Sequence, residues 1–329
     1  MATAPPPART WRLLAALVAL VVALAACGGD DPAADDEPAG DEAASGSVEI
    51  DHVFGTTTVD GVPERIVSLD PQWTDVLLAL DVTPVGYITS PLQESDRFPW
   101  QEDGLDGSEP VNYVDQLPRD AIANLQPDLI LVTYAATGQP DYDSLVEIGA
   151  PVIAAPTDAE VQPWDELTEI IGRVLHREDD AAALIEETEA AIAAVGEELP
   201  GLDGRTIAFV NYVPGDSLWV LADAEDGAGE LFADLGLGIA PGIAAEGGDA
   251  TGRLQLSLER VDLLDGDVLV VLPNGGDVED LVGWDNLPAV QSGAVATIDQ
   301  SAAFALNTPS PLSIPYGIDA IRPALEAAA

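Results

Sequence analysis

The sequence of 329 residues contains no lysine, a single cysteine and two histidines. Without lysine, the chain cannot form a lysine Schiff base, a P-loop or a Ser-Lys catalytic pair. The single cysteine, Cys27, excludes an internal disulfide and has no second cysteine at metal-site spacing. His52 and His176 have no neighbours that suggest a Ser-His-Asp triad. These absences exclude several classes of catalysis.

Positive charge is also scarce. Eleven arginines stand against 59 Asp and Glu residues, which gives a net charge of −48. Nucleic acids and anionic lipid head groups both require basic patches on a protein partner. We therefore expect no nucleic-acid partner.

Short enzyme motifs are missing as well. The sequence has no G-x-S-x-G, no H-E-x-x-H and no phosphate-binding glycine loop. Carboxylates are too numerous for one pair to stand out as a catalytic acid and base. We predict that the protein is not an enzyme, with a carboxylate-dependent hydrolase as an alternative.

The N-terminus has the features of a secretory signal. Arg9 and Arg12 precede an apolar run, residues 13–26, that is too short to span a bilayer comfortably. The end of this run has a small-residue cleavage pattern. Its last residues with Cys27, Leu-Ala-Ala-Cys, resemble the lipobox of bacterial lipoproteins, which implies that Cys27 is lipidated. We expect an extracytoplasmic protein held at the cell membrane by lipid alone; the alternative is an ordinary signal peptide, residues 1–26, with an incidental cysteine.

An acidic tether is predicted next. Residues 27–47 consist almost wholly of Gly, Asp, Glu, Ala, Pro and Ser without apolar periodicity, which is typical of a disordered, self-repelling segment. Removal of Arg9 and Arg12 with the signal would leave nine arginines against the same 59 acids, a net charge of −50.

From Val48 onward, short apolar runs alternate with helical stretches. The runs predict buried strands at 65–69, 84–88, 128–134 and 151–156, and then at 206–212, 217–223, 267–273 and 294–299. Helices are predicted between them at 72–80, 119–125, 141–149, 228–236, 256–264 and 317–326. Such alternation indicates βαβ units with a parallel sheet. We predict an α/β fold with two similar lobes, residues 48–163 and 203–329.

A helical segment, residues 164–202, separates the two series. It is rich in Ala, Glu, Leu and Ile, and beyond Trp164 it has no proline before Pro200. A helix of about 20 residues from Asp179 to Leu199 would be ~30 Å long. We predict that it connects the lobes.

Several motifs resemble, in order and spacing, the lipid-anchored substrate-binding proteins of ABC importers for iron-siderophore complexes and vitamin B12. They are "PERIVSLDPQWTDVLLALDVTPVGY", "IANLQPDLILVTY", "EIGAPVIA" and "TPSPLSIPYGIDAIRPAL", and the resemblance covers about residues 48–328. It implies two α/β lobes with central, mostly parallel sheets, joined by one long rigid helix, with the ligand in the cleft between them. It also implies delivery of the ligand to an ABC permease and its ATPase. We expect a monomer without a cofactor, in which iron enters only as a chelated siderophore complex.

Ligand contacts are predicted where strands end in loops. Small-molecule pockets are largely apolar and aromatic with a few polar anchors, and in open α/β sheets they lie at the carboxyl ends of strands. The candidate residues are Trp73, Arg97, Trp100, Tyr134, Tyr212, Arg253, Asn274 and Phe304. For each aromatic side chain the alternative is core packing, and Trp219, inside a predicted strand, is expected in the core.

The resemblance also implies two carboxylates that dock the permease, Asp75 and Glu259. "PQWTD" resembles the family's "P-x-x-T-E", with Asp75 in place of Glu, and Glu259 lies in "LSLER". The alternative is that both are ordinary solvated acids.

The scarcity of arginine bears on the ligand. Only Arg97 and Arg253 are positioned to reach the cleft, whereas a ferric tris-catecholate carries about three negative charges that need several cations. Two guanidinium groups suffice to donate hydrogen bonds to a hydroxamate or mixed carboxylate complex. We predict a ferric hydroxamate-type siderophore ahead of a catecholate, with vitamin B12 or haem as alternatives. A surface signalling or interaction lipoprotein is the alternative of another class.

Overall fold

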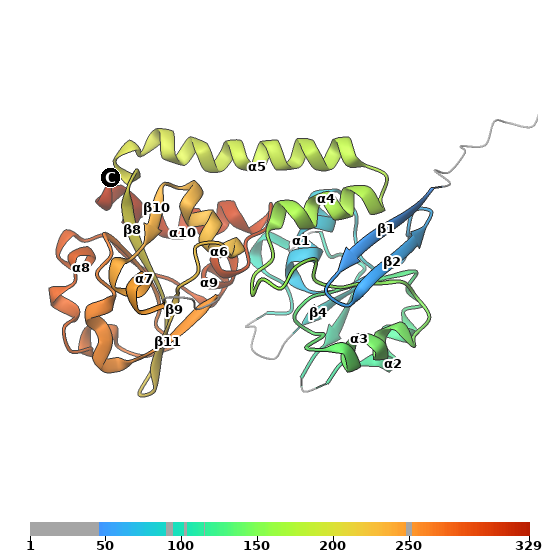
Figure 1. Cartoon of the computed structure of the whole chain (residues 1–329), viewed down its shortest axis with the longest axis horizontal. Helices are drawn as coiled ribbons and strands as arrows, with labels where there is room; N and C mark the ends of the chain where they lie inside the picture. The colour runs from blue at the N-terminus through green and yellow to red at the C-terminus, as the bar shows by residue number, and fades with distance from the viewer. Residues whose placement is uncertain (1–45, 90–94, 102–103, 115, 248–251) are drawn as a thin grey trace, which may run out of the picture. The chain divides into compact units, whose positions relative to one another are not determined.

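The computed structural model describes residues 46–89, 95–101, 104–114, 116–247 and 252–329 (Figure 1). The predicted signal peptide, Cys27 and nearly all of the predicted tether lie outside these residues. The chain divides into residues 1–42 and 43–329, and the elements described below all belong to the second unit. Among the described residues, no helix has the length and apolar character needed to cross a membrane.

The N-terminal lobe is built on a parallel sheet with the strand order β5-β4-β3-β6-β7. The strands are β3 (Ile66–Leu69), β4 (Gly86–Thr89), β5 (Glu109–Asn112), β6 (Leu129–Val132) and β7 (Val152–Ile153). Every residue of β3 and β6 is buried, as expected for a parallel sheet covered on both faces. Alternate residues of β6 divide between two core clusters, with Leu129 and Leu131 on one face and Ile130 and Val132 on the other.

Helices cover both faces of this sheet. They are α1 (Pro71–Ala79) on one face, and α2 (Arg119–Asn124) and α3 (Gln139–Val146) on the other. A short 3-10 helix, η1 (Pro99–Gln101), lies between β4 and β5 in the chain. A hairpin of β1 (Ser47–His52) and β2 (Gly55–Asp60) precedes the sheet. Thr57 links this hairpin to β7, because its hydroxyl donates to the Val152 carbonyl at 2.7 Å. The same hydroxyl lies 2.9 Å from His52 Nε2 within the hairpin.

The C-terminal lobe has a mixed sheet with the order β11-β9-β8-β12-β13, in which β10 also pairs with β8. The strands are β8 (Arg205–Val213), β9 (Ser217–Leu221), β10 (Leu237–Ile239), β11 (Arg253–Ser257), β12 (Val268–Leu272) and β13 (Val295–Thr297). The strand predicted at 217–223 is antiparallel to β8, not parallel. Residues 214–216 are too short for a parallel crossover and allow only a hairpin.

The remaining elements of this lobe are helical. They are η2 (Pro200–Leu202), α6 (Gly227–Asp234), α7 (Pro241–Gly247), η3 (Leu258–Leu263), η4 (Val278–Asp280), η5 (Trp284–Asn286), α8 (Pro288–Ser292), α9 (Gln300–Asn307) and α10 (Ser313–Ala328). The helix predicted at 256–264 therefore consists of the end of β11 and a short 3-10 helix. The expected α/β architecture with two lobes is confirmed, although the second sheet is mixed.

The segment between the lobes forms two helices, α4 (Trp164–Val174) and α5 (Glu178–Glu198). They are separated by a turn in which His176 adopts a φ of 53°. The apolar face of α4 belongs to the N-terminal core. The 21-residue α5 contacts both cores, since Leu184 packs on the N-terminal cluster, whereas Ile192 and Val195 are part of the C-terminal cluster. Figure 1 shows α5 as one uninterrupted helix.

The packing of α4 on α5 generates a test. A Cβ atom at Gly172 would lie 2.5 Å from the Cβ of Ala181. We predict that Gly172→Ala lowers the free energy of unfolding by about 1–3 kcal/mol, because overpacking forces the helices apart.

Gly196 in α5 is the matched control, since a Cβ atom there meets nothing within 4 Å. Gly196→Ala should raise the free energy of unfolding by about 0.5–1 kcal/mol through helix propensity alone. Urea unfolding of both variants measures the difference. Equal stability of the two would contradict the close packing at Gly172.

Candidate ligand-binding site

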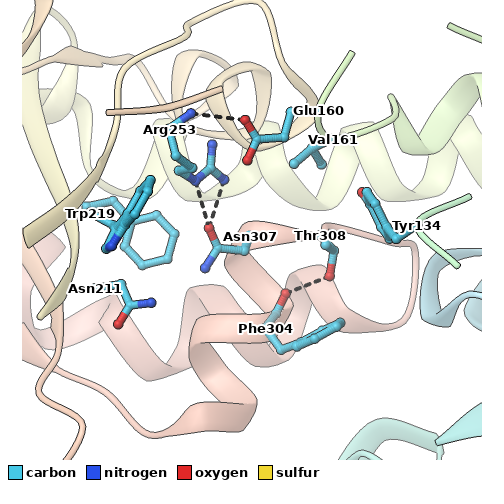
Figure 2. A pocket seen from close by; sticks show the side chains of 10 residues that line it. Tyr134, Glu160, Val161, Asn211, Trp219, Arg253, Phe304, Asn307 and Thr308 are labelled. Atoms are coloured by element: carbon cyan, nitrogen blue, oxygen red, sulfur yellow. Dashed lines mark hydrogen bonds between the residues drawn. The ribbon is translucent and has the colours of Figure 1, made fainter. Parts of the chain in front are cut away.

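A cavity of about 600 Å³ is lined by residues of both lobes (Figure 2). The N-terminal side supplies Tyr134, which follows β6, and the segment before α4. The C-terminal side supplies residues of β8, β9, β11 and α9. The lining residues are Tyr134, Glu160, Val161, Phe209, Asn211, Trp219, Arg253, Phe304, Asn307 and Thr308.

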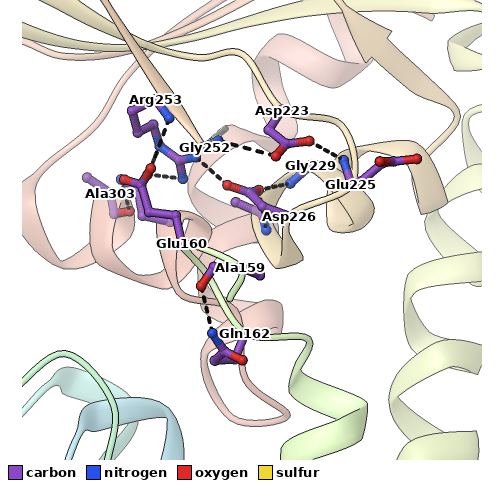
Figure 3. A network of polar contacts seen from close by, with 12 residues as sticks. Ala159, Glu160, Gln162, Asp223, Glu225, Asp226, Gly229, Gly252, Arg253 and Ala303 are labelled. Atoms are coloured by element: carbon purple, nitrogen blue, oxygen red, sulfur yellow. Dashed lines mark hydrogen bonds and ion pairs between the residues drawn. The ribbon is translucent and has the colours of Figure 1, made fainter. Parts of the chain in front are cut away.

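Arg253 is the one cation among these lining residues, and each of its three guanidinium nitrogens donates to a neighbour. Nε and Nη2 donate to Asn307 Oδ1 at 3.1 and 2.7 Å, and Nη1 donates to Asp226 Oδ2 at 2.7 Å. The backbone N–H of Arg253 donates to Glu160 Oε2 at 3.2 Å. Arg253 thus brings one guanidinium group to this region, which also holds the carboxylates of Asp226 and Glu160, so the described residues here have no surplus of positive charge. Figure 3 shows this network.

Local structure fixes the position of Asp226. It is the N-cap of α6, and its Oδ1 accepts from the backbone N–H groups of Ala228 and Gly229 at 3.1 and 2.8 Å. Because Asp226 is only 1% exposed, its second oxygen needs a buried donor, and Arg253 supplies it. Gly252 has a φ of +71°, and a Cβ atom there would overlap the Glu160 carboxylate. A glycine is therefore required where β11 begins.

Aromatic side chains form the apolar wall of the cavity. Tyr134 and Trp219 are 41% and 39% exposed, and Phe304 is half-buried on α9. The prediction of Tyr134, Arg253 and Phe304 as cleft residues agrees with this placement, although their contact with a ligand stays a prediction.

Sequence reasoning missed other lining residues. Trp219, expected in the core, is the exposed residue between buried Leu218 and Val220 of β9. The prediction of Tyr212 was displaced by one residue along β8. Successive side chains of a strand point to opposite faces, so Tyr212 is in the core, whereas Asn211 lines the cavity.

Two further predicted residues do not line the cavity. Trp73 is 0% exposed and packs in the N-terminal core, so it cannot contact a ligand here. Asn274 supports the wall from outside, because its Nδ2 donates to Asn211 Oδ1 and, at 2.9 Å, to the Tyr212 carbonyl. Position directly after a strand thus selected residues that support the cavity wall as well as residues that line the cavity.

Arg97 and Trp100 also lie away from the cavity. Arg97 forms an ion pair with Asp106 at 2.9 Å and donates to the Leu105 carbonyl at 3.0 Å. Trp100 stacks on Phe98 with ring centroids 4.7 Å apart, and its ring lies 5.2 Å from that of Tyr316 on α10. Trp100 therefore packs between the lobes.

Asp75 is at the centre of this contact between the lobes and is only 2% exposed. Its carboxylate accepts from Trp100 Nε1 at 2.8 Å, from Gln101 Nε2, and from Ser310 Oγ of the other lobe at 2.6 Å. Beside it, Gln72 Nε2 donates to the Pro309 carbonyl at 2.8 Å. Burial raises the pKa of Asp75 to about 6, outweighing these hydrogen bonds, which lower it.

This burial corrects the prediction that Asp75 docks a permease, because a carboxylate enclosed by three donors is not available at the surface. Glu259, in contrast, is exposed in η3, and its docking role stays a prediction.

Two α/β lobes, a helix in contact with both cores and a cavity lined from both sides define a two-lobed binding protein. Residues 66–302 match the family model described as periplasmic binding protein. The chain belongs to this family, which is one of binding proteins and not of enzymes.

Relatives support this assignment. The probable siderophore-binding lipoprotein YfiY of Bacillus subtilis is 24% identical over 63% of this chain, and the match covers 61% of YfiY, less than two thirds of its length. The Fe(3+)-citrate-binding protein YfmC of the same organism is 26% identical over 88% of this chain and 90% of YfmC. The structure of Streptococcus pneumoniae PiaA in complex with ferrichrome is 27% identical and covers 85% of this chain and 99% of PiaA, with a TM-score of 0.71.

The burial of Asp75 predicts a pH dependence of stability. Its pKa of about 6 lies above the ordinary value of 3.8, so the folded protein binds an extra proton between these pH values. The resulting stability is fully present below about pH 4 and is lost as the pH rises through about 6. Asp75 should therefore lower the free energy of unfolding by roughly 3 kcal/mol between pH 4 and pH 7.5. We predict that this decrease is absent in Asp75→Asn.

Urea unfolding at pH 4, 6 and 7.5 measures this decrease, with Asp285→Asn as the control because Asp285 is exposed. Asp70, whose pKa is also raised, contributes in the same direction to all three proteins. An unchanged pH profile in Asp75→Asn would contradict the prediction.

Proposed function

We propose that this protein is the extracytoplasmic substrate-binding component of an ABC importer, and that it captures a ferric siderophore and delivers it to the permease and its ATPase. The observation that carries the proposal is the cavity of about 600 Å³ lined by both lobes of a periplasmic binding protein. The names of YfiY and YfmC, and the PiaA complex with ferrichrome, are consistent with an iron complex as ligand. Iron is then part of the cargo.

The charge of the cavity favours a hydroxamate-type complex over a catecholate. Asp226 balances Arg253, and Glu160 adds a further carboxylate. A tris-catecholate complex, with about three negative charges, would enter this site without compensation. A complex of low charge can instead accept hydrogen bonds from Asn211, Asn307 and the remaining N–H groups of Arg253. Vitamin B12 and haem are the alternative ligands of the same cleft.

Tryptophan fluorescence tests the ligand class, because Trp219 lines the cavity. We predict quenching by ferric hydroxamates at lower concentration than by ferric catecholates, vitamin B12 or haem. Trp219→Phe should remove most of the quenching, and Asn211→Ala and Arg253→Ala should weaken binding roughly tenfold by removing donors.

Arg119→Ala is the control, since Arg119 pairs with Glu147 on the surface of α2 and does not line the cavity. Tight catecholate binding with no hydroxamate binding would overturn the charge argument. Unchanged affinity in both cavity variants would overturn the site.

The proposed location depends on Cys27, which lies outside the described residues. We propose that it carries the lipid anchor, because it follows a signal-like apolar run and precedes an acidic, glycine-rich segment. Cys27→Ala should yield protein that is either released or unprocessed, as cell fractionation and mass spectrometry of the N-terminus would show. A processed Cys27→Ala protein retained at the membrane would refute the anchor.

A further inference from the structure

Two asparagine side chains line the C-terminal side of the cavity, Asn211 near the end of β8 and Asn307 at the end of α9. A side-chain amide has an acceptor oxygen at one end and a donor NH2 group at the other, so its orientation decides what it offers to a ligand. In both asparagines one end of the amide contacts the protein. The chemistry of those contacts determines which end is left for the cavity.

Asn274 fixes the orientation of Asn211. Its Nδ2 donates to the Tyr212 carbonyl at 2.9 Å, and because a carbonyl can only accept, the atom in contact must be the amide nitrogen. The same NH2 group contacts the Asn211 amide, which must therefore turn its oxygen toward Asn274. The NH2 group of Asn211 has no partner among the described residues, and Figure 2 shows it directed toward Phe304 and Asn307.

A tight turn after β12 holds Asn274 in this place. The Gly276 N–H donates to the Pro273 carbonyl at 2.8 Å, and the two central residues, Asn274 and Gly275, have φ values of 47° and 78°. A type I′ turn requires positive φ at both central residues, and asparagine followed by glycine is a favoured pair. The turn thus accounts for asparagine at position 274, and its side chain then reaches Asn211.

Arg253 fixes the second amide by the same logic. Its Nε and Nη2 can only donate, so the atom of Asn307 that they contact is Oδ1. Asn307 Nδ2 donates one hydrogen to the Ala303 carbonyl at 3.0 Å, which leaves its other N–H for the cavity. Both amides therefore turn donors, and not oxygens, toward the ligand.

We propose that Asn274 is a positioning residue for ligand binding, which holds the Asn211 amide with its NH2 group toward the cavity so that Asn211 and Asn307 together donate to the iron-coordinating oxygens of the ligand. The inference rests on the proposed function, because hydroxamate oxygens that coordinate iron have lost their proton and can only accept. With the opposite orientation, the Asn211 oxygen would face these oxygens and repel them.

The variant Asn274→Asp tests the orientation. Aspartate has the same shape and also tolerates positive φ, but its carboxylate cannot donate. Asn211 then keeps the contact only by turning its NH2 group toward residue 274, which brings its oxygen to the cavity. Fluorescence titration with a neutral ferric tris-hydroxamate should show roughly tenfold weaker binding. Asn286→Asp, the same change at an exposed position that does not line the cavity, should leave the affinity unchanged.

A double-mutant cycle separates positioning from general damage or added charge. In Asn211→Ala, which lacks the amide, a further Asn274→Asp substitution should cause no additional loss of affinity. If Asn274→Asp does not fold, Asn274→Gly takes its place, since glycine keeps the turn but frees the Asn211 amide to rotate. About half of the molecules then present the donor, so binding should weaken about twofold. Equal losses with and without the Asn211 amide, or no loss in the Asn274 variant, would overturn the positioning role.

The positioning role and the proposed function can fail separately. If the ferric complex does not bind the unmodified protein, the proposed function fails, and NMR of the ligand-free protein then measures the amide orientation. The side-chain NH2 protons of Asn274, assigned by their absence in Asn274→Gly, should shift upfield in Asn211→Ala, because they lose an acceptor. They should shift downfield in Asn211→Asp, because a carboxylate is a stronger acceptor. Any other pattern of shifts would overturn the inferred orientation.

Discussion

The ion pair between Arg253 and Asp226 joins the elements that form the cleft. Its side chains are 14% and 1% exposed, whereas in every other ion pair of the described residues both partners are at least 29% exposed. Exposed pairs contribute little to stability, but loss of one partner from a buried pair leaves an uncompensated charge. Through this pair and its hydrogen bonds, Arg253 connects β11 to α6, to Asn307 of α9 and to Glu160 of the opposite wall.

Direct contacts between the lobes also position the cleft. Gln72 accepts from the Tyr134 hydroxyl at 3.2 Å and donates to the carbonyls of Gln162 and Pro309. One side chain of α1 thus joins a cavity residue to the segment before α4 and to the opposite lobe. Asp75 lies one turn further along α1 and accepts from Ser310. A change in the separation of the lobes must break the two hydrogen bonds that cross between them, to the Pro309 carbonyl and from Ser310. Because Gln72 also contacts Tyr134, ligand contacts and lobe contacts are coupled through α1.

Much of the fold follows from the sequence, because apolar runs and helical stretches are local signals. The strands β3, β6, β8 and β12 and the long α5 were predicted close to their observed bounds. The strand β9 was also predicted, but its antiparallel pairing with β8 was not, since the apolar pattern of a strand does not indicate its direction. For the cleft, position at a strand end identified Tyr134, and the scarcity of other available arginines identified Arg253. Position at a strand end could not separate Asn211 from Tyr212, which differ in the face to which they point. The sequence around Asp226 did not indicate that it pairs with a cavity residue, because its partner Arg253 is distant in sequence.

The scarcity of positive charge links these observations. With so few cations in the chain, Asp70 and Asp75 are buried with neutral donors alone, and burial raises the pKa of both. Around Arg253, in contrast, Asp226 balances the guanidinium group and Glu160 adds a further carboxylate at the cavity wall. Electrostatic complementarity mainly governs specificity, so this arrangement should discriminate most strongly against ligands that bring negative charge to the cavity.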